Sequence, residues 1–211
     1  MFKLYTFSHS SASYRVRIVL ALKGLAWTGE AINLTDGSQR QPDFLALNPQ
    51  GRVPALVTDQ GVLTQSLAII DWLEDTHPSP SIYPKDAFAR AHCRAFAHAI
   101  AGDIFPLQNL STRQKFAKDF GADAGVQAQW CADWIQVGFE ALEAQLAGRM
   151  AGHTGYLFGD TPTLADICLV PQMNNARRYG VDLSVFPLLV AADAKARAHP
   201  AFVSTAPETQ S

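Results

Sequence analysis

The feature that most constrains the fold of this 211-residue chain is a change of hydrophobic pattern at a short proline- and serine-rich stretch, Pro78–Pro84. Before it, short β-prone runs alternate with segments whose apolar residues recur at helical spacing. After it, the strand pattern stops and alanine-rich segments with apolar residues at i, i+3 and i+4 follow one another. The sequence therefore predicts an α/β domain over residues 1–80 and an all-α domain over residues 87–211, joined by this linker.

The predicted order of strands and helices in the first domain is β-α-β-(α)-β-β-α. Its predicted strands are Lys3–Phe7, Trp27–Leu34, Pro54–Val57 and Val62–Leu63. The last two are joined by a hairpin-type turn at Asp59-Gln60-Gly61, and a helix ends near His77-Pro78. A strand–helix–strand start followed by a hairpin predicts a small sandwich whose sheet is part parallel and part antiparallel.

The second domain is predicted to contain only helices. The expected helices are Ala87–Leu110, Val126–Leu146, Thr163–Arg178 and Leu188–Ala198. The tail after Phe202 is polar, and we expect it to be frayed.

Composition and charge exclude several classes of function. The net charge is −2 and both signs are mixed along the chain, which argues against nucleic acid as a partner. No apolar run reaches the roughly 18 residues that cross a membrane, and the first residues lack a leader pattern, so we expect a cytoplasmic protein. Three cysteines, Cys93, Cys131 and Cys168, lie too far apart for a disulfide framework or a zinc site, and we expect them to be buried. The spacing of His92 and His98 does not place them on one face of a helix, so they are not expected to share a metal ion.

A serine-rich segment, Ser10-Ser11-Ala12-Ser13, lies between the first strand and the first helix. Hydroxyls and unpaired N–H groups at a helix N-terminus favour an anion, and a thiolate is such an anion. A serine hydroxyl directed at it would lower the pKa of the thiol further. The alternative is that a serine simply caps the helix.

Three further motifs lie at element boundaries. Val53-Pro54 comes just before a strand, where a cis bond would let Val53 pair with an extended peptide. Gln65-Ser66 starts a helix, with Ser66 as the expected N-cap and a carboxylate as a suitable ligand. Thr163 and Asp166 form a capping box, which we interpret as structural. A basic pair, Arg177-Arg178, lies near the end of a helix, and as a solvated pair that offsets the helix dipole it needs no function.

Together these segments resemble the zeta-class glutathione transferases, the family of maleylacetoacetate isomerase and the bacterial maleylpyruvate isomerases. The similarity extends from about residue 3 to about residue 203. The matching strings are Ser10-Ser11-x-Ser13-x-Arg15-Val16-Arg17-Ile18, Ala46-Leu47-Asn48-Pro49, Val53-Pro54, Gln65-Ser66-Leu67-Ala68-Ile69-Ile70, Pro106-Leu107-Gln108-Asn109-Leu110-Ser111 and Asp166-x-Cys168-Leu169-Val170-Pro171-Gln172.

The resemblance implies a thioredoxin-like N-terminal domain that binds glutathione, an all-helical C-terminal domain that carries the substrate side of the cleft, and a homodimer. It implies glutathione contacts from Ser10, Ser11, Gln39, Val53, Pro54, Gln65, Ser66, Gln108 and Asn109. Ser10 is the expected partner of the thiol, with Ser11 as the alternative. Arg178 would meet an acidic substrate, with His9 or Arg15 nearby, and a structural role is the alternative for Arg15.

The implied reaction is glutathione-dependent cis–trans isomerisation of a small dicarboxylate, by thiolate addition, bond rotation and elimination. Two positions depart from the family pattern: Ala12 replaces the usual cysteine, and His9 replaces an arginine that helps to hold a substrate carboxylate. The alternatives are maleylpyruvate isomerisation in aromatic degradation, glutathione transfer to halo-acids or other small electrophiles, and a non-catalytic interaction module.

Overall fold

The computed structural model describes residues 1–148 and 155–210. The chain divides into two compact units, Met1–Ser81 with Ala198–Ser211, and Ile82–Arg197. We call the first the N-terminal unit and the second the helical unit, and each is described by itself.

The N-terminal unit is built on a four-stranded mixed sheet with the order β2-β1-β3-β4. Its strands are β1 (Phe2–Thr6), β2 (Trp27–Ala31), β3 (Ala55–Thr58) and β4 (Gly61–Thr64). β1 pairs with β2 in parallel and with β3 antiparallel, and β3 forms the predicted hairpin with β4. The predicted part-parallel, part-antiparallel sandwich is confirmed.

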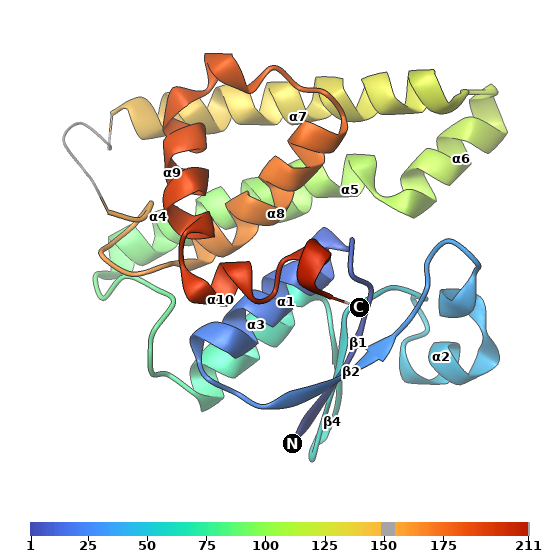
Figure 1. The fold of residues 1–211 in the computed structure, drawn as a ribbon, viewed down its shortest axis with the longest axis horizontal. Coiled ribbons are helices and arrows are strands. Elements are labelled where there is room, and N and C mark those ends of the chain that lie inside the picture. Colours follow the sequence, from blue (N-terminus) through green and yellow to red (C-terminus); the bar gives the residue numbers. More distant parts are fainter. Residues whose placement is uncertain (149–154, 211) are drawn as a thin grey trace. The chain divides into compact units, whose positions relative to one another are not determined.

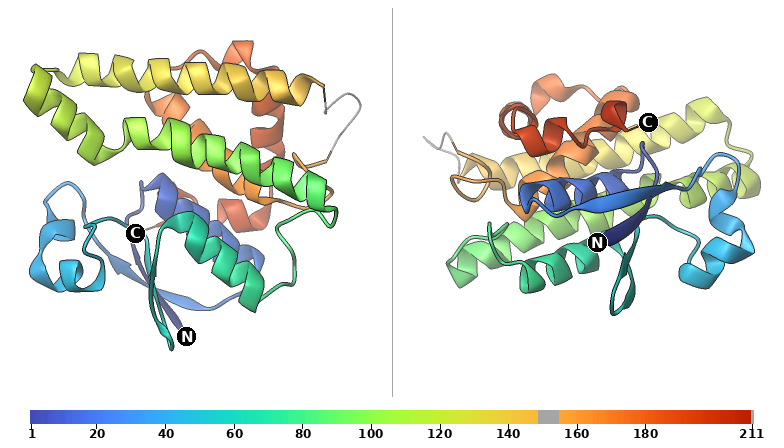
Figure 2. Two further views of the ribbon diagram at one scale, coloured as in Figure 1. Left: turned by 180° about the vertical axis from the view of Figure 1, so that it is seen from behind. Right: turned by 60° about the horizontal axis from the view of Figure 1, so that its bottom comes forward.

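Helices cover both sides of this sheet. α1 (Ser11–Leu22) and α3 (Ser66–Thr76) lie side by side on one side, while α2 (Pro42–Leu47) lies on the other (Figures 1 and 2). Every residue of α1 from Ser11 to Leu20 is buried, and the helix packs against α3 and the C-terminal segment. The core therefore forms around α1, and its N-terminus carries the serine-rich segment.

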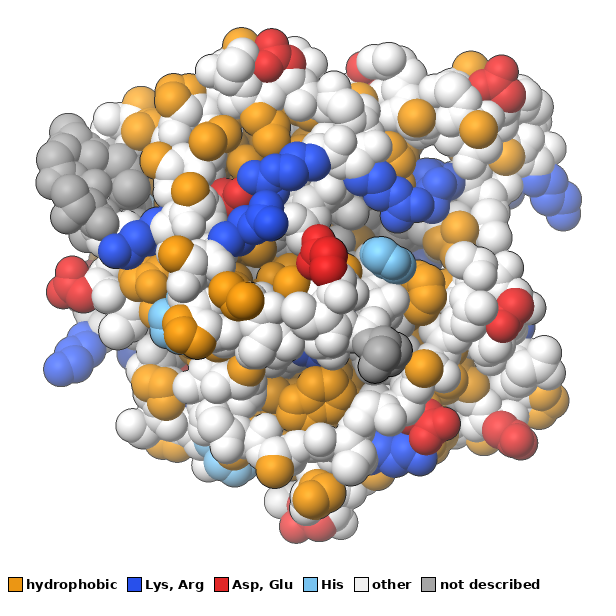
Figure 3. All heavy atoms as spheres, in the orientation of Figure 1, with side chains coloured by type: hydrophobic (Ala, Val, Ile, Leu, Met, Phe, Trp, Pro, Cys, Tyr) orange, Lys and Arg blue, Asp and Glu red, His pale blue; other side chains and the backbone are white. Residues whose placement is uncertain are grey.

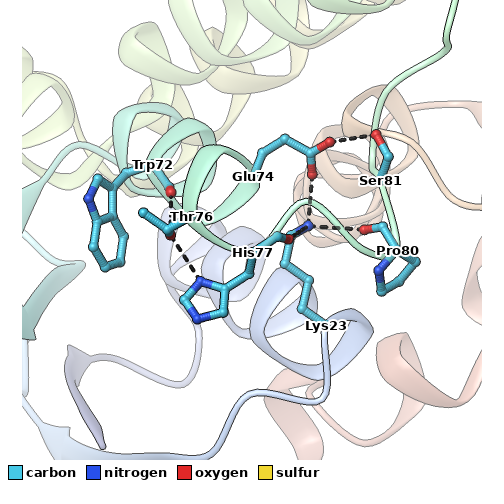
Figure 4. Close-up of polar contacts among 7 residues, drawn as sticks. All are labelled: Lys23, Trp72, Glu74, Thr76, His77, Pro80 and Ser81. Atoms are coloured by element: carbon cyan, nitrogen blue, oxygen red, sulfur yellow. Dashed lines mark hydrogen bonds and ion pairs between the residues drawn. The ribbon is translucent and has the colours of Figure 1, made fainter.

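A buried lysine fixes the end of α3 and the start of the linker (Figure 4). The Lys23 side chain is fully buried, and its Nζ lies 2.7 Å from Glu74 Oε2 and 2.7 Å from the His77 carbonyl oxygen. A third bond joins Nζ to the Pro80 carbonyl oxygen at 3.0 Å, and Ser81 Oγ donates to the other Glu74 oxygen. All three N–H donors of the ammonium are thus used, as burial of a charge requires.

The C-terminal segment packs on the N-terminal unit instead of fraying, and so the division of the chain differs from the expected 87–211 domain. Tyr14 Oη donates to the Phe202 carbonyl oxygen at 2.9 Å, and Arg17 Nε donates to the Thr205 carbonyl oxygen at 3.2 Å. α10 (Pro200–Val203) contacts α1, and Thr205 is buried. The polar composition of the tail concealed this, because its partners lie on a helix 188 residues earlier in the chain.

The helical unit contains α4 (Ala87–His98), a π-helical turn (Ala99–Ile104), α5 (Phe105–Gln108), α6 (Leu110–Phe120), α7 (Ala124–Ala147), α8 (Leu164–Arg178) and α9 (Pro187–Arg197). The predicted single helix Ala87–Leu110 is wrong in detail. Pro106 has no N–H to donate to the preceding turn, so the helix loosens just before it. Asn109 is extended and starts α6, a helix that the apolar periodicity did not reveal.

α8 is the most buried helix of this unit and packs against α4 and α9. The predicted capping box at its start is confirmed: the buried Asp166 carboxylate accepts from Thr163 N at 2.8 Å, from Thr163 Oγ1 at 2.7 Å and from Leu157 N at 3.1 Å. The role of Asp166 is therefore structural.

The described surface carries both signs of charge. Acidic, basic and apolar side chains all occur on the face drawn in Figure 3. Within residues 1–148 and 155–210, none of the helices is both long enough and apolar enough to span a bilayer.

Candidate functional site

Ser10 caps the N-terminus of α1, which is the alternative role that the sequence left open for one of its serines. Ser10 has extended backbone angles, and its Oγ accepts from Ser13 N at 3.2 Å. This cap uses the oxygen as an acceptor and leaves its O–H as a donor. Ser11 is the first helical residue and is buried, whereas Ser10 is partly exposed. The first turn of α1 contains no acidic residue, so the positive end of the helix dipole stays uncompensated.

Arg17 holds the turn that leads into this cap. Its guanidinium is fully buried and donates to the carbonyl oxygens of Ser8 at 2.9 Å and Phe7 at 3.2 Å. It also donates to Thr6 Oγ1 at 3.0 Å. Burial lowers the pKa of Arg17 to about 10, which leaves it charged at neutral pH. His9, the next residue after Ser8, is exposed and meets the Phe7 ring edge-on.

The N-terminus of α3 differs from the prediction. Gln65, not Ser66, is the N-cap, so the predicted capping role of Ser66 is wrong. Gln65 has φ 67° and is the one non-glycine residue with a positive φ in the described part of the chain. Its amide donates to Gln50 Oε1 at 2.7 Å instead of capping the helix, and the first turn of α3 has no acidic residue.

Ser66 is the first residue of α3 and is buried. Its Oγ accepts from Arg15 Nη1 at 3.5 Å, across from α1 to α3. Arg15 is itself 1% exposed. The geometry therefore gives Arg15 a structural contact within the N-terminal unit, which was one of its two expected roles.

Two other predicted glutathione contacts lie in the same unit. The Val53–Pro54 bond is cis, as predicted, and both residues are buried just before β3. Gln39 lies in a 3₁₀ turn, Ser38–Arg40, where its Nε2 donates weakly to the Leu34 carbonyl oxygen at 3.4 Å. The buried Gln39 Oε1 has no hydrogen-bond partner among the described residues.

Gln108 and Asn109 belong to the helical unit and both have partners there. Gln108, at the end of α5, donates to Gln172 Oε1 at 2.7 Å. Asn109 caps α6, since its Oδ1 accepts from Thr112 N at 3.0 Å and from Ser111 Oγ at 2.8 Å. Their contact with glutathione stays a prediction.

The two arginines at the end of α8 differ in their surroundings. Arg177 forms an ion pair with the buried Asp193 of α9, so it is not the purely solvated residue of the simpler interpretation. Arg178 is exposed, and its guanidinium carbon lies 5.8 Å from the centre of the Tyr179 ring. Among the described residues, no carboxylate forms an ion pair with Arg178.

The remaining titratable groups suggest no other chemistry. All three cysteines are buried, as predicted, and burial raises the pKa of Cys93 to about 11. Within residues 1–148 and 155–210, no group of three His, Cys, Asp or Glu side chains is arranged to hold a metal.

Sequence reasoning missed the contacts of Arg17 and Gln50. A cation inside the apolar run of α1 was the visible signal for Arg17, whereas Gln50 had none.

Comparisons with known proteins agree with this architecture. Family models for the glutathione S-transferase N-terminal domain and C-terminal domain match residues 9–76 and 128–203. The chain is 46% identical to maleylpyruvate isomerase from Ralstonia sp, over 99% of this chain and 98% of that protein. It is 44% identical to maleylacetoacetate isomerase from Pseudomonas aeruginosa, over 99% and 97% of the two chains.

Solved structures give the same result. A holo structure of maleylpyruvate isomerase, described as a bacterial glutathione S-transferase of the zeta class, matches with a TM-score of 0.95 at 46% identity and covers 99% of this chain and 98% of that one. A maleylacetoacetate isomerase from Methylobacterium extorquens, solved with malonate and glutathione, matches with a TM-score of 0.94 at 34% identity and covers 99% and 98%. The chain therefore belongs to the glutathione transferase family, in its zeta class with the maleylacetoacetate and maleylpyruvate isomerases.

Proposed function

We propose that the protein is a glutathione-dependent cis–trans isomerase of the maleylacetoacetate isomerase type. The observation that carries the proposal is Ser10, whose hydroxyl keeps a donor at the uncompensated N-terminus of α1. The relatives support it, since full-length matches bear the names maleylacetoacetate isomerase and maleylpyruvate isomerase.

The hydrogen-bond donors of the N-terminal unit suit the charged groups of glutathione. α1 and α3 both begin without an acidic residue in the first turn, so each offers N–H groups and a positive dipole end to an anion. Glutathione carries a carboxylate and a thiol that can ionise. We assign the carboxylate to Gln65 and Ser66, and the thiol to Ser10. The unpartnered Gln39 Oε1 is a suitable acceptor for an N–H group of the peptide.

When bound, glutathione supplies the sulfur nucleophile that adds to an electron-poor double bond and leaves again after the bond has rotated. The chain supplies three things. Ser10 Oγ–H donates to the thiolate and, with the end of α1, lowers the pKa of the thiol. Arg17 keeps the turn before Ser10 in place through its bonds to Phe7 and Ser8. Arg178, which no described carboxylate pairs with, supplies positive charge for a substrate carboxylate.

Maleylpyruvate is a second candidate substrate, favoured by the 46% identity with the Ralstonia enzyme. The test is to bind the purified protein to immobilised glutathione and then to assay both maleylacetoacetate and maleylpyruvate. An isomerase turns over many equivalents of substrate with a catalytic amount of glutathione, whereas a transferase for halo-acids consumes one glutathione per turnover. Binding without either activity would support a non-catalytic module and overturn the proposal.

We further propose that the protein is a homodimer in the cytoplasm, as the resemblance implies. The three buried free thiols are in keeping with a reducing compartment. Light scattering on the purified protein measures the mass directly, and a monomer of 22.9 kDa would contradict the dimer.

A further inference from the structure

A second arginine lies beside Arg178 within the helical unit. Arg113, in the first part of α6, places its guanidinium carbon 6.0 Å from the centre of the Tyr179 ring. Arg178 reaches the same ring centre at 5.8 Å. Two cations from different helices therefore gather around one aromatic ring, although each repels the other.

The ring lies beside the buried Cys131 of α7, and burial raises the pKa of both Tyr179 and Cys131. Both Arg113 and Arg178 act on the Cys131 thiol by charge and lower its pKa, against a larger rise caused by burial. The two guanidinium groups come from α6 and α8, and both lie near the Tyr179 ring and the Cys131 thiol of α7.

Neither cation is neutralised by the described residues. Neither Arg113 nor Arg178 takes part in the ion pairs of the described residues, which include Lys3–Glu30, Lys23–Glu74, Lys115–Asp119 and Arg177–Asp193. Arg113 Nε is buried and has no hydrogen-bond partner in the described part of the chain. A buried donor without a partner is costly, so its presence points to a ligand that accepts from it.

We infer that Arg113 and Arg178 together bind a carboxylate of the acidic substrate, which makes Arg113 a specificity-determining residue for the proposed reaction. The inference rests on the proposed function for the identity of the ligand. Two guanidinium groups are well suited to a carboxylate, because each presents N–H donors in a planar fork.

The test uses Arg113→Gln, which removes the charge and keeps a polar side chain, and Arg113→Lys, which keeps the charge without the fork. Lys118→Gln is the matched control, because Lys118 is an exposed cation on the same helix. We expect Arg113→Gln to raise KM for the dicarboxylate about 10- to 100-fold with little change in kcat or in glutathione affinity. Arg113→Lys should recover part of the loss, and turnover of a neutral electrophile should not change.

Malonate binding separates this inference from the proposed function. The probe is malonate itself, titrated at constant ionic strength into the protein with saturating glutathione. In one outcome, the wild-type protein isomerises neither substrate but Arg113→Gln still lowers the affinity for malonate at least tenfold. The proposed isomerase function is then wrong, whereas the carboxylate site at Arg113 and Arg178 is supported. If the wild type is an isomerase and Arg113→Gln behaves like Lys118→Gln in both assays, the inference is overturned.

A measurement on the wild type covers the case in which Arg113→Gln does not fold. The Nε–H resonance of Arg113, assigned with the Arg113→Lys protein, should shift when malonate is added. No shift at a malonate concentration that saturates the site would overturn direct contact with Arg113.

Discussion

Arg17 Nη2 donates to the Ser8 carbonyl oxygen at 2.9 Å, so a fully buried cation of α1 holds the turn that leads to Ser10. The same side chain reaches Thr205 near the C-terminus. One residue therefore connects the start of the candidate thiol site to the last segment of the N-terminal unit.

Replacing Arg17 should destabilise the protein and disturb the thiol site. In Arg17→Met, the carbonyl oxygens of Ser8 and Thr205 lose the donor that Arg17 provides, whereas Phe7 keeps its bond from Ser10 N, and each buried group left unpaired costs about 1–3 kcal/mol. We expect the free energy of unfolding in urea to fall by about 3 kcal/mol or more. Lys118→Met is the control, and equal unfolding curves for the two variants would contradict the anchoring role.

Ser10 has two roles that one pair of variants can separate. Ser10→Ala removes both the helix cap and the donor to sulfur, so it should cost about 1 kcal/mol of stability and lower kcat strongly. Ser10→Asp keeps a good cap but has no donor at neutral pH, so it should keep the melting temperature and still lose turnover. The measurements are thermal unfolding, kcat and glutathione affinity. If Ser11→Ala alone abolishes turnover, the thiol partner is Ser11.

Replacing Arg178 should change substrate affinity, whereas replacing Arg177 should change stability. Arg178→Ala should raise KM for a dicarboxylate about 10- to 150-fold, because one charged contact contributes about 1.5–3 kcal/mol, and it should leave stability nearly unchanged. Arg177→Ala should leave KM unchanged but reduce stability, because it removes the ion-pair partner of buried Asp193. Equal and small effects on KM would indicate a transferase for neutral electrophiles.

The stability loss in Arg177→Ala should depend on pH. Burial raises the pKa of Asp193 above its ordinary value, and Arg177 opposes that rise. A carboxyl whose pKa is higher in the folded state favours folding when protonated, and this contribution is lost as pH rises. Without Arg177 the penalty on the ionised form grows, so the variant should lose more stability at pH 7 than at pH 4. Urea midpoints at the two pH values measure this difference.

Gly138 allows α7 to pack closely on the π-helical turn. A methyl group at this position would overlap the buried Ile104 side chain, whereas a methyl group at Gly102 meets nothing within 4 Å. Both glycine-to-alanine changes gain about 1 kcal/mol of helix propensity, but only Gly138→Ala suffers overpacking of about 1–3 kcal/mol. Gly138→Ala should therefore be less stable than Gly102→Ala by that amount. Equal free energies of unfolding would show that Ile104 moves aside freely.

The cysteines should not react in the folded protein. With a pKa of about 11, the Cys93 thiol is ionised to about one part in a thousand at pH 8, and all three thiols are buried. Mass spectrometry after iodoacetamide treatment should find no modification in buffer and three in urea. Because the proposed chemistry uses the sulfur of glutathione, Cys93→Ser should retain turnover. Loss of activity on native alkylation would contradict this.

Local patterns predicted most of the fold because hydrophobic period, caps and turn residues act over a few residues. The strand and helix order of the first domain, a serine cap on its first helix and the Thr163–Asp166 box were all visible in this way. The apolar period failed at Pro106, where a missing N–H broke a pattern that otherwise continued. The predicted cap at Ser66 was also wrong, because the N-cap is Gln65, whose positive φ depends on the loop that holds it and not on its own preference.

The sequence alone determined the class of protein, the division into an α/β part and a helical part, and the segments that carry the chemistry, because these depend on residue type and spacing. Only the tertiary structure decided which side chains have partners. It paired Arg177 with Asp193, left Arg178 without a described carboxylate and brought Arg113 to the same tyrosine from another helix. It also drew the polar tail onto α1 through Tyr14 and Arg17. Contacts between residues far apart in the chain leave no periodic signal, so packing alone selects them.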